Sequence, residues 1–331
     1  MIIVTGGAGF IGSALVWRLN QLGKEDILIV DSLGTDEKWK NLVSLRYHDY
    51  MEKDEFLSLV VNQRLAARLR PDNEPIEAII HMGACSATTE RDASYLIRNN
   101  FEYTRQLAVA AISEGSRFIY ASSAATYGDG SKGFSDNERT IDSLRPLNMY
   151  GYSKQLFDQW ALRRGLLDRI VGLKYFNVYG PNENHKGDMR SVVMKAFEQI
   201  GETGKIKLFK SYKDEYKDGE QVRDFVYVKD AVEMTLFFLE NKSAAGLFNV
   251  GSGVPNTWNK LASAIFSAMG KQMNIEYVDM PETIRGKYQY YTCADVSKIR
   301  KAGYSRAMTS IEDAVSDYVQ NYLKAGKRLG E

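Results

Sequence analysis

Short apolar runs alternate with longer amphipathic stretches through the first half of the chain. The runs have the length and composition of buried strands, and each ends in small or polar residues. We expect strands at 2–5, 27–31, 78–81, 117–123 and 170–177. A helical periodicity between them predicts helices over 12–22, 54–67, 90–114 and 150–164. This alternation is typical of an α/β fold with a doubly wound parallel sheet.

After residue 177 the pattern changes to loops, and this change predicts a second, smaller lobe. We expect a helix near 187–201, a strand at 205–209 and a polar, densely charged stretch over 210–221. Buried strands at 225–228 and 247–250, around a helix over 229–240, would return the chain to the sheet before a C-terminal helix at 310–324. The lobes are then discontinuous: the larger domain takes 1–176, 225–254 and 289–312, and the smaller takes 177–224, 255–288 and 313–331.

Composition narrows the function classes. With 43 Lys and Arg against 42 Asp and Glu, the chain has a net charge of +1, and no overall field favours nucleic acid or an anionic membrane. No apolar run reaches the ~18 residues of a membrane span, and no signal-like segment precedes the first strand, so we expect a cytoplasmic protein. Cys85 and Cys293 have no metal-ligand spacing, and we expect two reduced thiols and no metal site.

A glycine-rich turn joins the first strand to the first helix. Gly6, Gly9 and Gly12 occur in TGGAGFIG, and glycines in this context allow a tight turn and close approach of a pyrophosphate to the helix N-terminus. Asp31 ends the second strand 19 residues beyond Gly12, where a carboxylate can bind the adenosine ribose. This pattern predicts a Rossmann-type dinucleotide site. Asp31 alone favours NAD, whereas Lys38 and Lys53 could balance the 2′-phosphate of NADP.

Candidate redox residues follow at the carboxyl edge of the predicted sheet. Ser123 ends a strand, and Tyr150 and Lys154 share one face of a helix at i and i+4. A nearby ammonium and a nicotinamide cation would stabilise the phenolate of Tyr150, which could then take a hydroxyl proton as hydride leaves carbon. Ser123 would bind the same oxygen, and Lys154 would also hold the nicotinamide ribose.

Together these motifs identify the chain as a member of the extended short-chain dehydrogenase/reductase family, which acts largely on nucleotide sugars. The resemblance runs from Met1 to about Tyr318. Dehydratases of this family carry an acidic pair after the active-site serine or threonine, but Ala124 and Ala125 stand here, so water elimination lacks its acid and base. An epimerase can use a second acid/base, and the loop with His185 and Lys186 offers one.

Five strings resemble the heptose 6-epimerases of this family: GACSATTE, YASSAATYG, MYGYSK, KYFNVYGP and HKGDM. The resemblance implies NADP-dependent inversion of C6 in an ADP-heptose for the lipopolysaccharide inner core, by a homo-oligomer that is expected to be a pentamer. It also implies that Tyr150 and Lys186 are the two acid/bases, supported by Ser123 and Lys154.

The same resemblance implies two sets of contacts. Besides the three glycines, the cofactor residues are Phe10, Ile11, Asp31, Ser32, Lys38, Lys53, Met82, Gly83, Ala84, Cys85, Ser86, Asn99, Lys154, Val178 and Lys186. The ADP-sugar residues are Ser123, Asn177, Asp188, Lys195, Phe209, Lys210, Ser211, Tyr212, Arg223 and Tyr288. Asp188 and Lys195 stand where relatives can carry serine and histidine. For Phe209, packing in the core is as well supported as a contact with the substrate.

Two other functions fit the motifs. A hexose-nucleotide epimerase, such as one acting at C4 of UDP-glucose, needs only one catalytic tyrosine. A non-catalytic nicotinamide sensor would keep the fold, but its expected mark is the loss of the tyrosine or lysine, and Tyr150 and Lys154 are both present.

Overall fold

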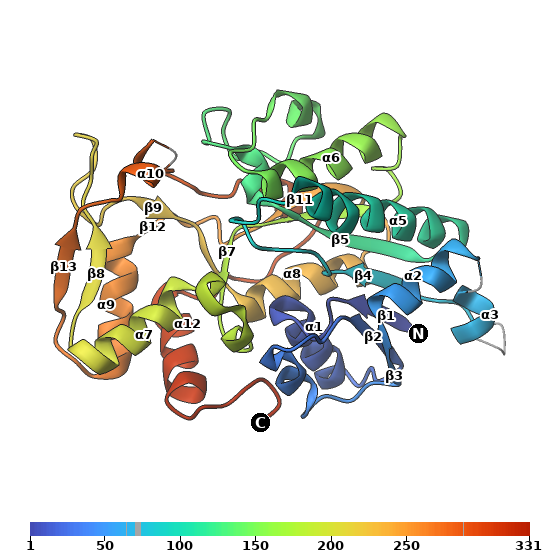
Figure 1. The fold of residues 1–331 in the computed structure, drawn as a ribbon, viewed down its shortest axis with the longest axis horizontal. Helices are drawn as coiled ribbons and strands as arrows, with labels where there is room; N and C mark the ends of the chain where they lie inside the picture. The colour runs from blue at the N-terminus through green and yellow to red at the C-terminus, as the bar shows by residue number, and fades with distance from the viewer. Residues whose placement is uncertain (64, 70–73, 287) are drawn as a thin grey trace.

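A parallel seven-stranded sheet forms the centre of the larger lobe in the computed structural model of the chain, which describes residues 1–63, 65–69, 74–286 and 288–331 (Figure 1). The strand order is β11-β6-β5-β4-β1-β2-β3, and every neighbouring pair is parallel. The strands are β1 (Ile2–Thr5), β2 (Ile27–Asp31), β3 (Asp49–Glu52), β4 (Ala78–His81), β5 (Arg117–Ser123), β6 (Val171–Tyr175) and β11 (Gly246–Val250). The predicted doubly wound parallel sheet is confirmed. The order reverses between β1 and β4, and such a switch point opens a ligand crevice at the carboxyl ends of the strands.

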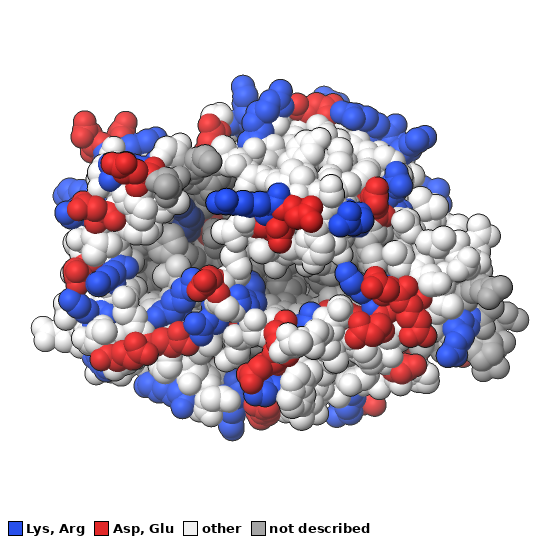
Figure 2. Space-filling model, in the orientation of Figure 1, with Lys and Arg blue, Asp and Glu red and all other residues white. Residues whose placement is uncertain are grey.

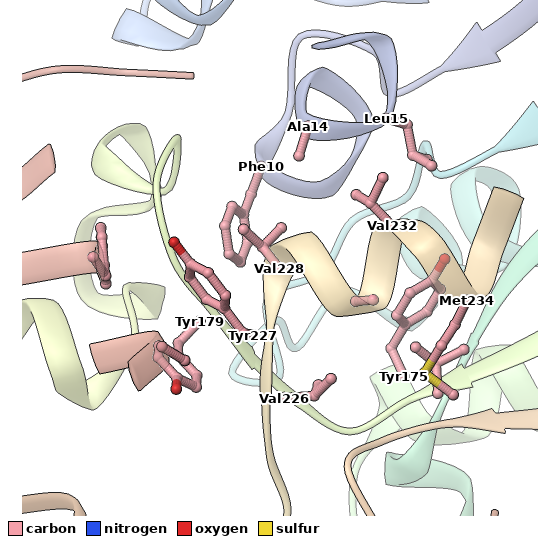
Figure 3. Packing of buried hydrophobic residues seen from close by; sticks show 14 of the residues in the cluster. Phe10, Ala14, Leu15, Tyr175, Tyr179, Val226, Tyr227, Val228, Val232 and Met234 are labelled. Carbon is pink, nitrogen blue, oxygen red and sulfur yellow. The ribbon is translucent and has the colours of Figure 1, made fainter. Parts of the chain in front are cut away.

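Helices cover both faces of this sheet. Successive side chains of β1 point to opposite faces of the sheet. Ile2 and Val4 belong to one buried cluster, and Ile3 belongs to the other. Helices α1 (Phe10–Gln21) and α8 (Val228–Glu240) pack together in the first cluster, where Figure 3 shows Leu15 near Val232. The second cluster is covered by α2 (Lys53–Val61), α5 (Tyr103–Ser113) and α6 (Met149–Arg163).

Two of the predicted helices are interrupted. The segment predicted over 54–67 forms α2 and the short α3 (Leu65–Leu69), with residue 64 outside the described residues. The segment predicted over 90–114 begins later, because Asp92 caps α4 (Ala93–Leu96) by accepting a hydrogen bond from the Tyr95 backbone N–H at 2.9 Å. A π-helical turn, Ile97–Glu102, then leads into α5.

The smaller lobe lies at the left of Figure 1 and is built around the parallel pair β8 (Ile206–Phe209) and β13 (Ile275–Val278). Its helices are α7 (Val192–Thr203), α9 (Trp258–Met269), α10 (Glu282–Arg285) and α12 (Ile311–Asp317). The helix predicted over 187–201 starts at Val192 because Ser191 caps it, and Asn184–Met189 forms a separate 3-10 helix. Neither α9 nor β13 was among the predicted elements.

One predicted strand does not join the central sheet. Strand β10 (Phe225–Tyr227) pairs with β7 (Asn177–Tyr179) in a separate two-stranded sheet, and Val228 already begins α8. The strand predicted over 170–177 therefore divides at Phe176 into β6 and β7. Only β11 returns to the central sheet, beside β6. In the described part of the chain, the remaining strands are β9 (Val222–Arg223) and β12 (Asn256–Thr257), which pair antiparallel, and the remaining α-helix is α11 (Ser297–Lys301).

Cys85 and Cys293 are free, half-buried thiols. Among the described residues, no helix has the length and apolar character that crossing a membrane requires. The same residues contain no group of three His, Cys, Asp or Glu side chains arranged to hold a metal ion.

Candidate active site

The turn after β1 is tightly packed against the backbone that follows β4. Gly6 has a φ of +66°, and a Cβ placed there would lie 2.6 Å from the Gly83 nitrogen. A Cβ on Gly12 would lie 2.0 Å from the Gly6 carbonyl oxygen. Gly9 precedes α1 and has no side chain to bind the first N–H groups of the helix. The turn can therefore present these N–H groups and the positive end of the helix dipole to a pyrophosphate.

Asp31 lies beside this turn at the end of β2. Its Oδ2 accepts a hydrogen bond from the Ala8 N–H at 2.9 Å, while its Oδ1 accepts from the Ser32 N–H at 2.7 Å and from the Lys38 ammonium at 3.0 Å. Lys53 donates to Asn99 at 2.8 Å. A cavity of about 240 Å³ collects many of the predicted cofactor residues: Gly6, Asp31, Ser32, Lys38, Lys53, Gly83, Ala84, Cys85 and Asn99.

A second cavity, of about 370 Å³, adjoins the N-terminus of α1. It brings together five further predicted cofactor residues: Phe10, Ile11, Ser86, Val178 and Lys186. Met82 instead packs on the core, and its sulfur accepts a hydrogen bond from the Tyr175 hydroxyl. The two cavities thus collect most of the residues that were predicted to bind the cofactor.

Ser123 and Tyr150 line the 370 Å³ cavity and also a larger one of about 880 Å³. Ser123 comes from the end of β5, and its Oγ accepts a hydrogen bond from the Ala125 N–H at 3.1 Å. Tyr150 comes from the first turn of α6, which Asn148 caps by accepting from the Gly151 N–H at 2.8 Å. Lys154 lies one turn further, is 4 % exposed, and donates to the Ala121 carbonyl at 2.8 Å.

The pKa of Tyr150 differs from the expectation that the Lys154 ammonium lowers it. Burial raises the pKa of the Tyr150 phenol, and the protein group that opposes this increase is the hydrogen-bonding Ser123 hydroxyl, not the Lys154 ammonium. Burial also lowers the pKa of Lys154 to about 8, against the opposing charge of Asp158. The ammonium therefore does not by itself bring the phenol toward neutral pH.

Lys186 enters the 370 Å³ cavity from the 3-10 helix between β7 and α7. Its Nζ lies 5.2 Å from the centre of the Phe10 ring, and burial lowers its pKa, with the Glu183 charge opposing. His185 points elsewhere, with Nδ1 3.4 Å from the Asn41 side-chain nitrogen. The structure thus places Tyr150 and Lys186 around one cavity and separates His185 from them.

Arg223 and Tyr288 line the 880 Å³ cavity with Asn177, which contributes to both cavities. The Arg223 guanidinium is held between two rings, 4.9 Å from the centre of Tyr288 and 5.5 Å from that of Trp258. The Trp258 indole N–H donates to the Tyr288 hydroxyl at 2.9 Å. Trp258 and Thr88, which lines both cavities, were missed by the sequence reasoning. Thr88 lies within the GACSATTE string, whereas no motif marks Trp258.

The other predicted substrate residues line neither cavity. Lys195 donates to the Asp188 carbonyl, and the ring of Phe209 lies 6.5 Å from that of Tyr288, beside the cavity wall. The remaining three contact other protein groups: Lys210 and Tyr212 donate to the Asp279 carboxylate, and the Ser211 hydroxyl donates to the Lys213 carbonyl. Their assignment to substrate stays a prediction. Figure 2 shows the face of the molecule that is hollowed between the two lobes, with Lys and Arg side chains around the hollow.

The switch-point crevice, the glycine turn and the Ser-Tyr-Lys group together define a nicotinamide-dependent enzyme class, and sequence comparison agrees. Residues 2–251 match the NAD dependent epimerase/dehydratase family, and the chain belongs to this family. A curated relative from Nitratidesulfovibrio vulgaris, named ADP-L-glycero-D-manno-heptose-6-epimerase, is 57% identical over 98% of each chain. The resemblance found in the sequence motifs is confirmed.

Solved structures place the fold in the same group. The Helicobacter pylori ADP-L-glycero-D-manno-heptose-6-epimerase is 26% identical, with a TM-score of 0.78 over 97% of this chain and 95% of that one. The UDP-glucuronic acid 4-epimerase from Bacillus cereus, solved with UDP-glucuronic acid and NAD, is 25% identical, with a TM-score of 0.76 over 98% and 99% of the two chains.

Proposed function

We propose that this protein epimerises C6 of ADP-D-glycero-β-D-manno-heptose to the L-glycero form on bound NADP, as a step toward the lipopolysaccharide inner core. The observation that carries the proposal is the placement of Tyr150 and Lys186 around one cavity that also adjoins the glycine turn. The full-length relative at 57% identity, with its heptose-epimerase name, supports the choice of sugar.

Two acid/bases at one cavity suit an inversion. Tyr150 is placed to take the proton of the C6 hydroxyl, with Ser123 binding the same oxygen. A nicotinamide held by Lys154 and the glycine turn would supply the hydride acceptor and donor for oxidation and re-reduction at C6. Lys186 then donates the proton on the opposite face of C6, for which its lowered pKa makes it more ready than an ordinary lysine. Lys154, one helical turn beyond Tyr150, would bind the nicotinamide ribose.

The residues at the adenosine end fit NADP. Asp31 already binds the Lys38 ammonium, and Lys53 lines the same cavity, so two cations stand where a 2′-phosphate would add negative charge. Denaturing the purified protein and identifying the released dinucleotide tests this choice. Release of NADP supports it, and release of NAD alone contradicts it.

Arg223 fits the diphosphate of an ADP-sugar. Its guanidinium is buried against Trp258 and Tyr288, which restrict its position, and arginine binds phosphate in a bidentate manner. Asn177 lies where the two cavities meet, within reach of both the sugar and the cofactor.

The function is tested by incubating cofactor-loaded protein with ADP-D-glycero-β-D-manno-heptose and following the sugar by NMR. Growth of the L-glycero signals supports the proposal. Unchanged starting material from folded, loaded protein overturns it.

A UDP-hexose 4-epimerase is the second candidate, because the Bacillus cereus 4-epimerase shares the fold at a TM-score of 0.76. Lys186→Ala separates the two. The heptose proposal predicts a fall in kcat of about 10²-fold, in the range that a general acid contributes, whereas a single-tyrosine mechanism predicts little change. Lys301→Ala is the matched control, since Lys301 is exposed on α11 and lines neither cavity.

A further inference from the structure

Lys174 is a buried cation outside both cavities. It lies on β6 and is 1% exposed. Its ammonium donates to Asp158 Oδ2 at 2.8 Å and to the Thr126 hydroxyl at 2.7 Å, and lies 5.1 Å from the centre of the Tyr127 ring. A buried ion pair of this kind gives little net stability over an apolar pair, because both charges lose their hydration. The pair therefore calls for another explanation.

Asp158 connects this cation to the strand that ends at Ser123. Besides the Lys174 ammonium, the carboxylate accepts hydrogen bonds from the Tyr120 hydroxyl at 2.9 Å and the Ser122 hydroxyl at 2.8 Å. Asp158 is fully buried and comes from α6, the helix that also carries Tyr150 and Lys154. One carboxylate thus joins β5, β6 and α6.

Thr126 connects the cation to the other side of Ser123. The Thr126 hydroxyl donates to the Ser123 carbonyl at 2.8 Å while it accepts from Lys174. Asp158 therefore holds the strand at Ser122, next to Ser123, and Thr126 holds the Ser123 carbonyl. Lys174 donates hydrogen bonds to both Asp158 and Thr126. None of these holding side chains lines the cavities.

We propose that Lys174, acting through Thr126 and Asp158, is a positioning residue that fixes the Ser123 turn against the helix carrying Tyr150. The inference rests on the proposed roles of Ser123 and Tyr150. A reacting group misplaced by about 1 Å can lose on the order of 10²-fold in rate, so a rigid support behind Ser123 matters for turnover more than for binding.

Thr126→Val is the sharpest test, because it keeps the shape of the side chain and removes the link from Lys174 to the Ser123 carbonyl. Tyr120→Phe is the matched control, since it removes one hydrogen bond from the same buried carboxylate without touching the turn. Thr126→Ser keeps the hydroxyl and should retain the wild-type kcat. Lys174→Met is unsuitable alone, because it leaves Asp158 charged and unpaired in the interior.

We expect Thr126→Val to lower kcat about tenfold with KM within about twofold, and Tyr120→Phe and Thr126→Ser to stay within about twofold of wild type. Hydrogen exchange gives a second readout that needs no substrate. The amides of Ala125 and Gly128, which bond within the turn, should exchange faster in Thr126→Val and not in Tyr120→Phe.

Wild-type kcat and exchange in Thr126→Val would overturn the inference, as would equal losses in Thr126→Val and Tyr120→Phe, which would indicate a general stability effect. Tyr150→Phe is measured beside them. If it retains full turnover, the proposed catalytic roles fail. If wild-type protein does not convert the heptose, the proposed function fails, while the exchange of Ala125 and Gly128 still tests the positioning.

Discussion

The cofactor side and the substrate side of the crevice differ in how they are built. On the cofactor side, Gly6 and Gly12 touch backbone, and Asp31 binds the N–H of Ala8 within the same turn. On the substrate side, Arg223 of β9 depends on Trp258 and Tyr288, which come from distant segments. The first depends mainly on close backbone contacts, and the second is an assembly of side chains from the smaller lobe.

This difference explains where motif reasoning succeeds. Backbone contacts allow only glycine, so they leave a pattern that can be recognised along the chain. Contacts between distant side chains leave no such spacing. We expect the two sides to differ also in their sensitivity to substitution.

The largest loss of kcat is expected from substitution of Tyr150, which lies where the cofactor side and the substrate side meet. Tyr150→Phe removes the phenol that takes the C6 hydroxyl proton and should lower kcat about 10³-fold, within the range for a general base. Steady-state kinetics with the ADP-heptose measures this, and cofactor content serves as the folding control. Turnover within tenfold of wild type would exclude Tyr150 as the base.

Gly12→Ala tests the backbone contact on the cofactor side. Its Cβ would lie 2.0 Å from the Gly6 carbonyl oxygen, so the turn must move, and we expect cofactor affinity to fall at least 10²-fold with a lower Tm. Gly201→Ala in α7 is the control, because a Cβ there meets nothing within 4 Å. Dinucleotide binding by calorimetry and thermal melting measure both. Normal binding by Gly12→Ala would refute the close-approach argument.

The pKa of Lys154 predicts an alkaline limit to activity. Since burial lowers this pKa to about 8, the ammonium is present below pH 8 and is lost as the pH rises above it. If its charge holds the nicotinamide ribose, kcat/KM should fall about tenfold per pH unit above 8. Lys154→Arg keeps the charge and should move this limb beyond pH 10. If kcat/KM of that variant still falls above pH 8, the alkaline limit belongs to a group other than Lys154.

Arg223→Lys tests the side-chain assembly on the substrate side. A lysine keeps the charge but loses the planar contact with both rings and the bidentate geometry, and we expect KM for the ADP-sugar to rise about tenfold with a smaller change in kcat. Kinetics over a range of substrate concentrations separate the two constants. An unaltered KM would place the diphosphate elsewhere.

The smallest effect is expected in the charged loop beyond β8. Tyr212 donates to the exposed Asp279 and lines neither cavity, so Tyr212→Phe should change kcat/KM by less than about twofold. A tenfold loss would show that this loop closes on the substrate and would restore the contact that the family resemblance implied.

The strands with short, continuous apolar runs could be predicted from the chain, as β1, β2, β4 and β5 match their expected bounds. Strand β10 could not be placed, because an apolar run of this length does not specify which neighbour it pairs with, and its partner is β7. Helix α9 was missed although it is amphipathic. Among site residues, Ser123 and Tyr150 follow from motifs, whereas Trp258 depends on the tertiary packing of α9 against Arg223.

In the proposed reaction, the hydrogen at C6 leaves the sugar and returns to its opposite face without exchange. Running the reaction on ADP-D-glycero-β-D-manno-heptose in deuterium oxide tests this directly by NMR and mass spectrometry. We expect an L-glycero product that keeps protium at C6. Deuterium at C6, or no conversion by folded and cofactor-loaded protein, would contradict it.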